Sequence, residues 1–177
     1  NAGGSVSGLN YATGSGPSSS QFISISGSTL DANITVTAPT NFEVSTNNSS
    51  FSDNLALTQS SGLVSSTAVY VRLKNGLSAG LYSGDISITS TNATTRTISL
   101  TGLVGTNYYV STTGSNSNNG LSEANAFENL KYAVDNVPAN NIINVGPGTF
   151  SADSDITINN SMIIKGSGRD KTIFDGS

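Results

Sequence analysis

The sequence predicts an all-β protein in two parts, a β-sandwich followed by the opening turns of a strand-and-turn solenoid. Three observations predict this. Short apolar–polar alternations recur between turn residues along most of the chain. Only 10% of residues are charged, against roughly 25% in ordinary soluble domains, and neutral polar residues suit the outer faces of strands. One apolar stripe, within residues 127–137, has helical spacing instead.

The first part of the chain is predicted to be a sandwich over residues 21–104. Residues 1–20 are rich in Gly and Ser, and we expect a linker there, with Leu9 to Tyr11 as a first edge strand. About seven strands follow at the spacing typical of a sandwich. In TAVYVRLK the alternation leaves two choices, with either Val69 and Val71 or Tyr70 and its neighbours facing inward. In the other strands, the residues predicted to face inward are Ile23, Ile25, Ile34, Val36, Leu55, Leu57, Ile86, Ile88, Ile98 and Leu100.

Three stretches of the sandwich carry a resemblance to a known family, namely LNYATGSGPSSSQFISISGSTLDANITVTAP with NFEVS, then VYVRLKNGLSAGLYSGDISITS, and finally ISLTG. They resemble the immunoglobulin-like modules of multidomain secreted proteins from Bacteroidetes-type bacteria. The resemblance implies a spacer or presenting module. Tyr82 stands close to the position of a tyrosine corner, a structural role.

The second part, residues 105–177, is predicted to contain a helix and solenoid strands. Asn125 with Glu128 has the spacing of a capping box, an apolar stripe follows, and Pro138 ends the helix. Two strands, IINVGPGTF and DITINNSMIIKGSG, and then KTIFDGS are separated by Gly-rich corners, as in a solenoid.

This part resembles the N-terminal cap and first coils of pectate-lyase-like, right-handed parallel β-helix proteins. The residues that carry the resemblance are YYVSTTGSNSNNG, AFENLKYAVDNV, NVGPGTF and ITINNSMIIKGSGRDKTIFDG. It implies that the helix caps the open end of the solenoid. The superfamily includes polysaccharide lyases, glycoside hydrolases and adhesins, whose active sites usually lie on later coils. Asn116 and Asn118 stand where the family loop often carries Asp, which argues against a cation there.

Candidate site residues are few, and each has a structural alternative. Asp153 and Asp155 are candidate metal ligands, although Ca²⁺ needs six to eight oxygens and turn-forming Asp is the simpler interpretation. Of Tyr108 and Tyr109 one must face inward and one outward, where it could stack on a sugar. The remaining carbohydrate-contact candidates are Lys165 and Arg169, at a Gly-Ser-Gly corner that is equally explained as solvated surface.

Composition excludes several classes of function. The net charge is −4 and the seven basic residues are scattered, so a nucleic-acid partner is not expected. No apolar run is long enough to insert into a membrane. Without His or Cys, the chain lacks the commonest general base, transition-metal ligand and thiol nucleophile.

We therefore expect a non-catalytic spacer or presenting segment of a bacterial secreted or cell-surface protein. The chain starts without Met and stops at Ser177, so we expect a piece of a longer polypeptide with further domains. The expected partner of its full β-helix is polysaccharide. No cofactor is expected in this segment, and Ca²⁺ stays open for the longer protein. The alternatives are the N-terminal part of a polysaccharide lyase or glycoside hydrolase, and a surface adhesin.

Overall fold

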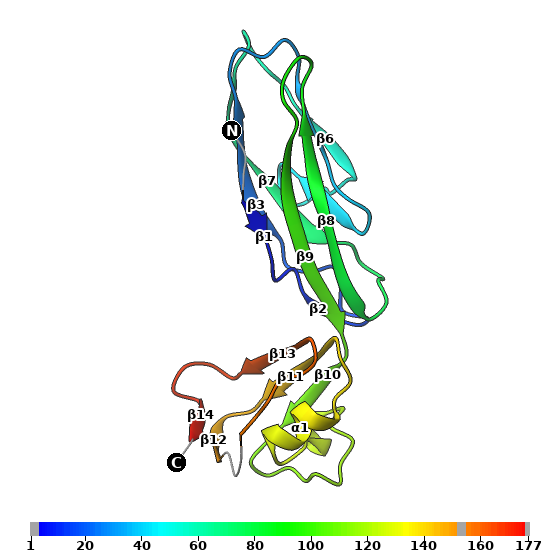
Figure 1. The fold of residues 1–177 in the computed structure, drawn as a ribbon, viewed down its shortest axis with the longest axis vertical. Helices are drawn as coiled ribbons and strands as arrows, with labels where there is room; N and C mark the ends of the chain where they lie inside the picture. The colour runs from blue at the N-terminus through cyan, green and yellow to red at the C-terminus, as the bar shows by residue number, and fades with distance from the viewer. Residues whose placement is uncertain (1–3, 152–154, 176–177) are drawn as a thin grey trace. The chain divides into compact units, whose positions relative to one another are not determined.

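The computed structural model describes residues 4–151 and 155–175 and is mostly β, with 47% of the chain in strands and, in that described part, one short α-helix (Figure 1). The chain divides into two compact units. The N-terminal unit comprises residues 1–77 and 81–103, and the C-terminal unit comprises residues 78–80 and 104–177. No helix in the described ranges is both long enough and apolar enough to span a bilayer.

Two sheets build the N-terminal unit. One has the order β1-β9-β8-β4-β6, with β2 also paired to β9, and the other has the order β3-β7-β5. The second sheet is antiparallel throughout, whereas β1 joins β9 in parallel. The strands are β1 (Ser5–Val6), β2 (Tyr11–Ala12), β3 (Gln21–Gly27), β4 (Ile34–Thr37), β5 (Phe42–Ser45), β6 (Asn54–Leu57), β7 (Val64–Leu73), β8 (Gly80–Thr89) and β9 (Arg96–Gly105).

The core of this unit follows the alternation of the sequence. In β4, Ile34 and Val36 are buried while both threonines are exposed. In β7, Val69 and Val71 are fully buried, so of the two possible registers the one with Tyr70 outward is the one adopted. Alternate residues of a strand point to opposite faces, so a single buried valine fixes the orientation of the whole strand.

Residues 1–20 were expected to be a linker with Leu9 to Tyr11 as an edge strand, and Leu9 and Tyr11 are packed into the N-terminal unit. Leu9 has no exposed surface and Tyr11 only 6%. The Tyr11 hydroxyl donates to the Lys74 carbonyl at 2.8 Å and accepts from the Leu77 N–H at 3.1 Å. Gly and Ser dominate the composition here, yet burial of the two side chains Leu9 and Tyr11, two residues apart, is enough to hold the segment against the core.

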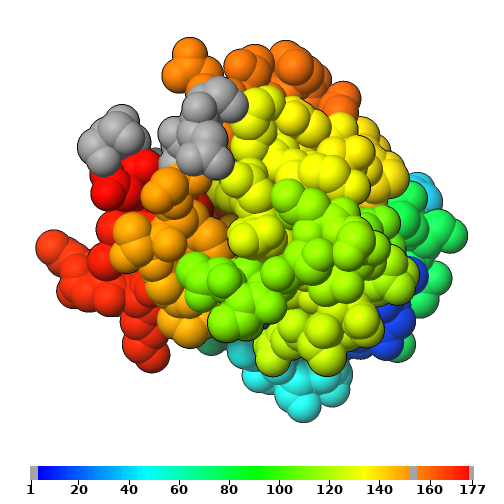
Figure 2. Space-filling view, turned by 90° about the horizontal axis from the view of Figure 1, so that it is seen from below, coloured from blue at the N-terminus to red at the C-terminus, as the bar shows by residue number. Residues whose placement is uncertain are grey.

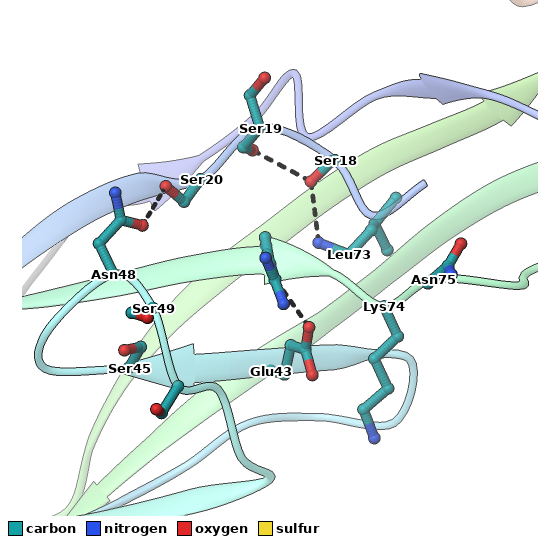
Figure 3. A network of polar contacts seen from close by, with 12 residues as sticks. Ser18, Ser19, Ser20, Glu43, Ser45, Asn48, Ser49, Leu73, Lys74 and Asn75 are labelled. Atoms are coloured by element: carbon teal, nitrogen blue, oxygen red, sulfur yellow. Dashed lines mark hydrogen bonds and ion pairs between the residues drawn. The ribbon is translucent and has the colours of Figure 1, made fainter. Parts of the chain in front are cut away.

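A chain of polar contacts fixes the approach to β3 against β7 (Figure 3). The Ser18 hydroxyl accepts the Leu73 N–H at 3.0 Å, in a buried position. Ser20 donates to Asn48 at 2.6 Å and thereby joins the segment before β3 to the loop after β5. The Ser18 bond satisfies a backbone N–H that burial would otherwise leave unpaired, whereas the Ser20–Asn48 bond joins two exposed side chains.

The C-terminal unit contains two parallel sheets. One has the order β10-β11-β13 and the other pairs β12 with β14. Asn141 of β11 pairs with Met162 of β13, and Gly148 of β12 pairs with Thr172 of β14. The strands β11 and β12 are thus followed along the chain by β13 and β14, which lie beside them and run in the same direction. The strands are β10 (Asn107–Val110), β11 (Asn141–Val145), β12 (Gly148–Ser151), β13 (Met162–Gly166) and β14 (Thr172–Asp175).

The helix of this unit starts later than its sequence predicts. A 3₁₀ turn, η1 (Glu123–Asn125), precedes α1 (Leu130–Asn136), and the N-cap of α1 is Asn129 rather than Asn125. Phe127 cannot be helical because its N–H donates to the Tyr109 carbonyl at 2.9 Å. Its backbone is therefore committed to pairing with β10, and tertiary pairing overrides the local capping signal.

A further difference concerns the strand predicted to begin at residue 155. Residues 155–160, predicted to open a strand, adopt no regular structure, and Ile158 is 54% exposed. The core of the unit lies between α1 and the sheets. It consists of Val110, Phe127, Leu130, Ala133, Val134, Val137, Ile143, Val145 and Phe150.

Candidate functional site

A transverse row of polar side chains crosses the sheet β10-β11-β13. The parallel register places Tyr109 beside Asn144, and Asn144 beside Lys165. The preceding row, Tyr108, Ile143 and Ile164, packs on the core. Because neighbouring residues of a strand face opposite ways, the row of Tyr109, Asn144 and Lys165 lies on the outward face.

Beside this row is a hollow of about 440 Å³, into which Tyr109 and Asn144 both contribute surface. Glu123 lines it from the 3₁₀ turn, and Ser167 lines it from the corner after β13. The hollow therefore combines an aromatic ring, a carboxylate, a carboxamide and a hydroxyl. An aromatic surface with a few placed polar groups is the usual composition of a site for a polyhydroxylated ligand.

Hydrogen bonds fix the orientation of Asn144. Its amide nitrogen donates to the Asn107 side-chain oxygen at 3.0 Å and to the Tyr108 carbonyl at 3.3 Å. With the nitrogen held in this way, the side-chain oxygen is the group available to a ligand. A polar residue between Ile143 and Val145, in a strand that is otherwise apolar, is the sequence signal that could have revealed this position.

The charged groups of this surface are unpaired in the parts of the chain the structure describes. Neither Glu123 nor Lys165 takes part in an ion pair there. Both are exposed, so either charge is free to meet a ligand, although water and salt will screen it.

At the corner after β13, Ser167 is engaged within the chain. The Ser167 N–H is bound by the Thr172 hydroxyl at 2.8 Å, and the Ser167 hydroxyl donates to the Val145 carbonyl at 2.9 Å. The Ser167 N–H is therefore not available to an anion. Arg169 is exposed on this corner, outside both the row and the residues that line the hollow.

Tyr108 and Tyr109 have different surroundings. Tyr108 stacks on Phe127, with ring centroids 6.3 Å apart and planes 8° apart, and packs against the core. Tyr108, a candidate carbohydrate contact in the sequence, is the tyrosine that faces the core, and its side chain is partly buried. Tyr109 is the tyrosine of the outward face.

The predicted acidic pair is only half described. Asp153 lies outside the described residues, and Asp155 is exposed. Within residues 4–151 and 155–175 there is no group of three or more Asp, Glu, His or Cys side chains that could hold a metal ion.

Asn116 has a structural task in the loop that precedes α1. Its side-chain oxygen accepts the N–H groups of Glu128 and Asn129 at 3.1 and 3.2 Å. Figure 2 shows this end of the C-terminal unit, where the loop and α1 (yellow-green and yellow) lie beside the orange and red residues that lead to the chain end. Asn116 therefore ties the loop to the start of the helix.

Comparisons with known proteins give little. No protein-family model and no curated protein matches the sequence. Among solved structures, a family 123 glycoside hydrolase from Clostridium perfringens, described for glycolipid glycan hydrolysis, is similar at 12% identity with a TM-score of 0.32. The match covers 58% of this chain and 25% of that chain. A likeness this slight supports no conclusion about fold or activity.

Proposed function

We propose that the chain is a non-catalytic spacer and presenting segment of a bacterial secreted or cell-surface protein. Its N-terminal unit is an immunoglobulin-like sandwich. Its C-terminal unit is the first part of a right-handed, pectate-lyase-like β-helix capped by α1. The outward row of Tyr109, Asn144 and Lys165 contacts polysaccharide.

The repeated parallel pairing supports the β-helix. β11 and β12 are matched in chain order by β13 and β14, which is how successive coils of a solenoid stack. Like side chains lie in register, with Ile143 beside Ile164 and Phe150 beside Phe174. Such ladders bury each coil against the next.

The row itself is the observation that carries the polysaccharide proposal. A parallel sheet repeats its outward positions at strand spacing, about 4.8 Å. A polymer lying across the strands therefore meets one side chain from each strand in turn. Tyr109 supplies a stacking surface, and Asn144 and Lys165 supply hydrogen-bonding groups farther along.

Affinity electrophoresis through gels that contain single soluble polysaccharides tests the proposal. The wild-type chain should be retarded by at least one member of a panel of neutral and acidic glycans. Tyr109→Ala should weaken that binding by about tenfold, which is ~1.4 kcal/mol, whereas Tyr109→Phe should keep most of it because the ring stays.

Arg169→Gln is the matched control for Lys165→Gln, since each removes one exposed cation from the same strand–corner segment. Only the Lys165 change should weaken binding. Equal retardation of all variants, or no retardation of the wild type by any glycan, would overturn the assignment of the row.

The alternative function is that of an enzyme acting on polysaccharide, and a direct activity assay distinguishes it from the spacer. We predict that the chain releases neither reducing ends nor unsaturated products from pectins, alginate or common glycans, with or without Ca²⁺. The sequence has no His or Cys, and efficient acid–base catalysis needs positioned groups of matched pKa. Turnover that is lost in Glu123→Gln would establish the enzyme and reject the spacer.

A further inference from the structure

The chain contains two Asn-Gly dipeptides, Asn75–Gly76 and Asn119–Gly120, and the structure holds them in opposite ways. In such a pair the Gly nitrogen can attack the side-chain carbonyl carbon of Asn, because no Cβ on the second residue obstructs the approach. The outcome depends on whether that nitrogen lies close to the amide or is held by an acceptor elsewhere.

At Asn75 the reacting groups are already adjacent. The Gly76 N–H donates to the Asn75 side-chain oxygen, and the nitrogen and the oxygen are 2.8 Å apart. Cγ is bonded to that oxygen at about 1.2 Å, so the electrophilic carbon is close to the nucleophile. Both residues are exposed, and a Cβ placed on Gly76 would have no neighbour within 4 Å. The Gly76 side of the turn is therefore open, while the Asn75 side-chain oxygen lies near Gly16.

The turn that contains this pair is braced by Tyr11. The Tyr11 hydroxyl bonds the Lys74 carbonyl on one side of the pair and the Leu77 N–H on the other. Asn75 itself sits just beyond Lys74 at the end of the network in Figure 3. A brace on both sides keeps the two groups together rather than letting the turn sample other conformations, which is the advantage of a positioned reactant pair.

At Asn119 the same chemistry is blocked. The Gly120 N–H donates to the Asn125 carbonyl at 2.9 Å, and the Asn119 side-chain oxygen accepts from the Leu121 N–H at 3.0 Å. Gly120 is buried with its Cα against the ring of Phe127. Its nitrogen cannot turn toward the Asn119 amide unless this packing opens.

We propose that Asn75 is a self-modification site, which converts to aspartate and isoaspartate through a cyclic imide with water as the co-reactant. Hydroxide removes the Gly76 N–H proton, and the nitrogen bonds Cγ of Asn75. The Cγ–Nδ2 bond then breaks, and the nitrogen leaves as ammonia after taking a proton from water. One water molecule opens the ring at either carbonyl, so the conversion of one asparagine consumes one water and releases one ammonia.

The modification changes the turn in two ways. Either product adds a carboxylate next to Lys74. Isoaspartate also adds one carbon to the main chain between Lys74 and Leu77, the two groups that Tyr11 bridges. The brace fails in that product, and the N-terminal segment that depends on Tyr11 loosens.

The test is a time course of the intact native chain in warm, mildly alkaline buffer, followed by digestion and mass spectrometry with fragmentation that separates aspartate from isoaspartate. Asn75 should react roughly tenfold to a hundredfold faster than Asn119, the scale by which a misplacement of ~1 Å slows a positioned reaction. In denaturant the two sites should react at similar rates, because the turn and the packing are gone.

Two variants separate this mechanism from simple exposure. Asn75→Gln keeps an exposed amide but lengthens the side chain, and it should abolish the product. Tyr11→Phe removes the brace and should bring the native rate at Asn75 toward the denatured rate. Equal native rates at Asn75 and Asn119, or a native Asn75 that reacts more slowly than in denaturant, would overturn the proposal.

Discussion

Phe150 of β12 and Phe174 of β14 occupy the same register position, and their rings lie 6.1 Å apart at 41°. Phe150 is 6% exposed and Phe174 is 52% exposed. Although the two phenylalanines have the same register position, Phe150 lies deep in the core and Phe174 lies at its margin.

We expect the two phenylalanines to contribute unequally to stability. Phe150→Ala should lower the free energy of unfolding of the C-terminal unit by about 3–5 kcal/mol, because it leaves a cavity. Phe174→Ala should cost about 1 kcal/mol, since half of its surface is already in water. Urea unfolding followed by tyrosine fluorescence measures both, and equal losses would contradict the burial difference.

Asn116 allows a second prediction, about the loop before α1. Asn116→Ala should cost about 1–2 kcal/mol, because it leaves the Glu128 and Asn129 N–H groups without their acceptor. Asn116→Asp keeps an oxygen at the same place and should stay within about 0.5 kcal/mol of the wild type. Thermal unfolding of the two variants decides this, and an equally damaging Asp would show that the amide NH₂ is the important group.

The sequence predicts strand faces well because alternation is a local signal. Ile34 and Val36 are inward as the period-two pattern predicts, whereas for Tyr108 and Tyr109 the pattern requires only that they face opposite ways. The predicted N-cap of the helix is wrong. Asn125 has the local sequence of a cap, but the long-range pairing of Phe127 with β10 decides where the helix can begin.

The candidate site was only partly predictable for the same reason. Tyr109 and Lys165 stand out as residue types, but nothing local places them in one row with Asn144. That row depends on the register between strands far apart in the chain. Glu123 and Ser167 reach the hollow from a turn and a corner whose positions only the fold provides.

The burial of Leu9 and Tyr11 leads to a third prediction, about where the N-terminal unit begins. A chain of residues 4–104 should unfold cooperatively in urea. A chain that begins at Gln21 should be less stable by several kcal/mol or unfolded, because it lacks both anchors. Leu9→Ala in the longer chain should cost about 2–5 kcal/mol. If the shorter chain is as stable as the longer one, the first 20 residues are a linker after all.

The last prediction concerns the strands nearest the C-terminus. Among the described strands, β14 pairs only with β12 and β13 only with β11, whereas β8 lies between β9 and β4. Ile173 and Phe174 are about half exposed. An edge strand with few buried contacts opens at low free energy, and in the β-helix that we propose a coil buries its apolar face only against neighbouring coils.

Native-state hydrogen exchange should therefore show faster exchange at Ile173 and Phe174 than at Ile86 and Ile88, at a protein concentration where the chain is monomeric. Raising the concentration is the control, because strand pairing between copies should slow exchange at β14 and leave β8 unchanged. Equal protection of β14 and β8 in the monomer would mean that the C-terminal unit closes its own core. A domain closed in that way does not need stacked coils, and the β-helix proposal would then have to be given up.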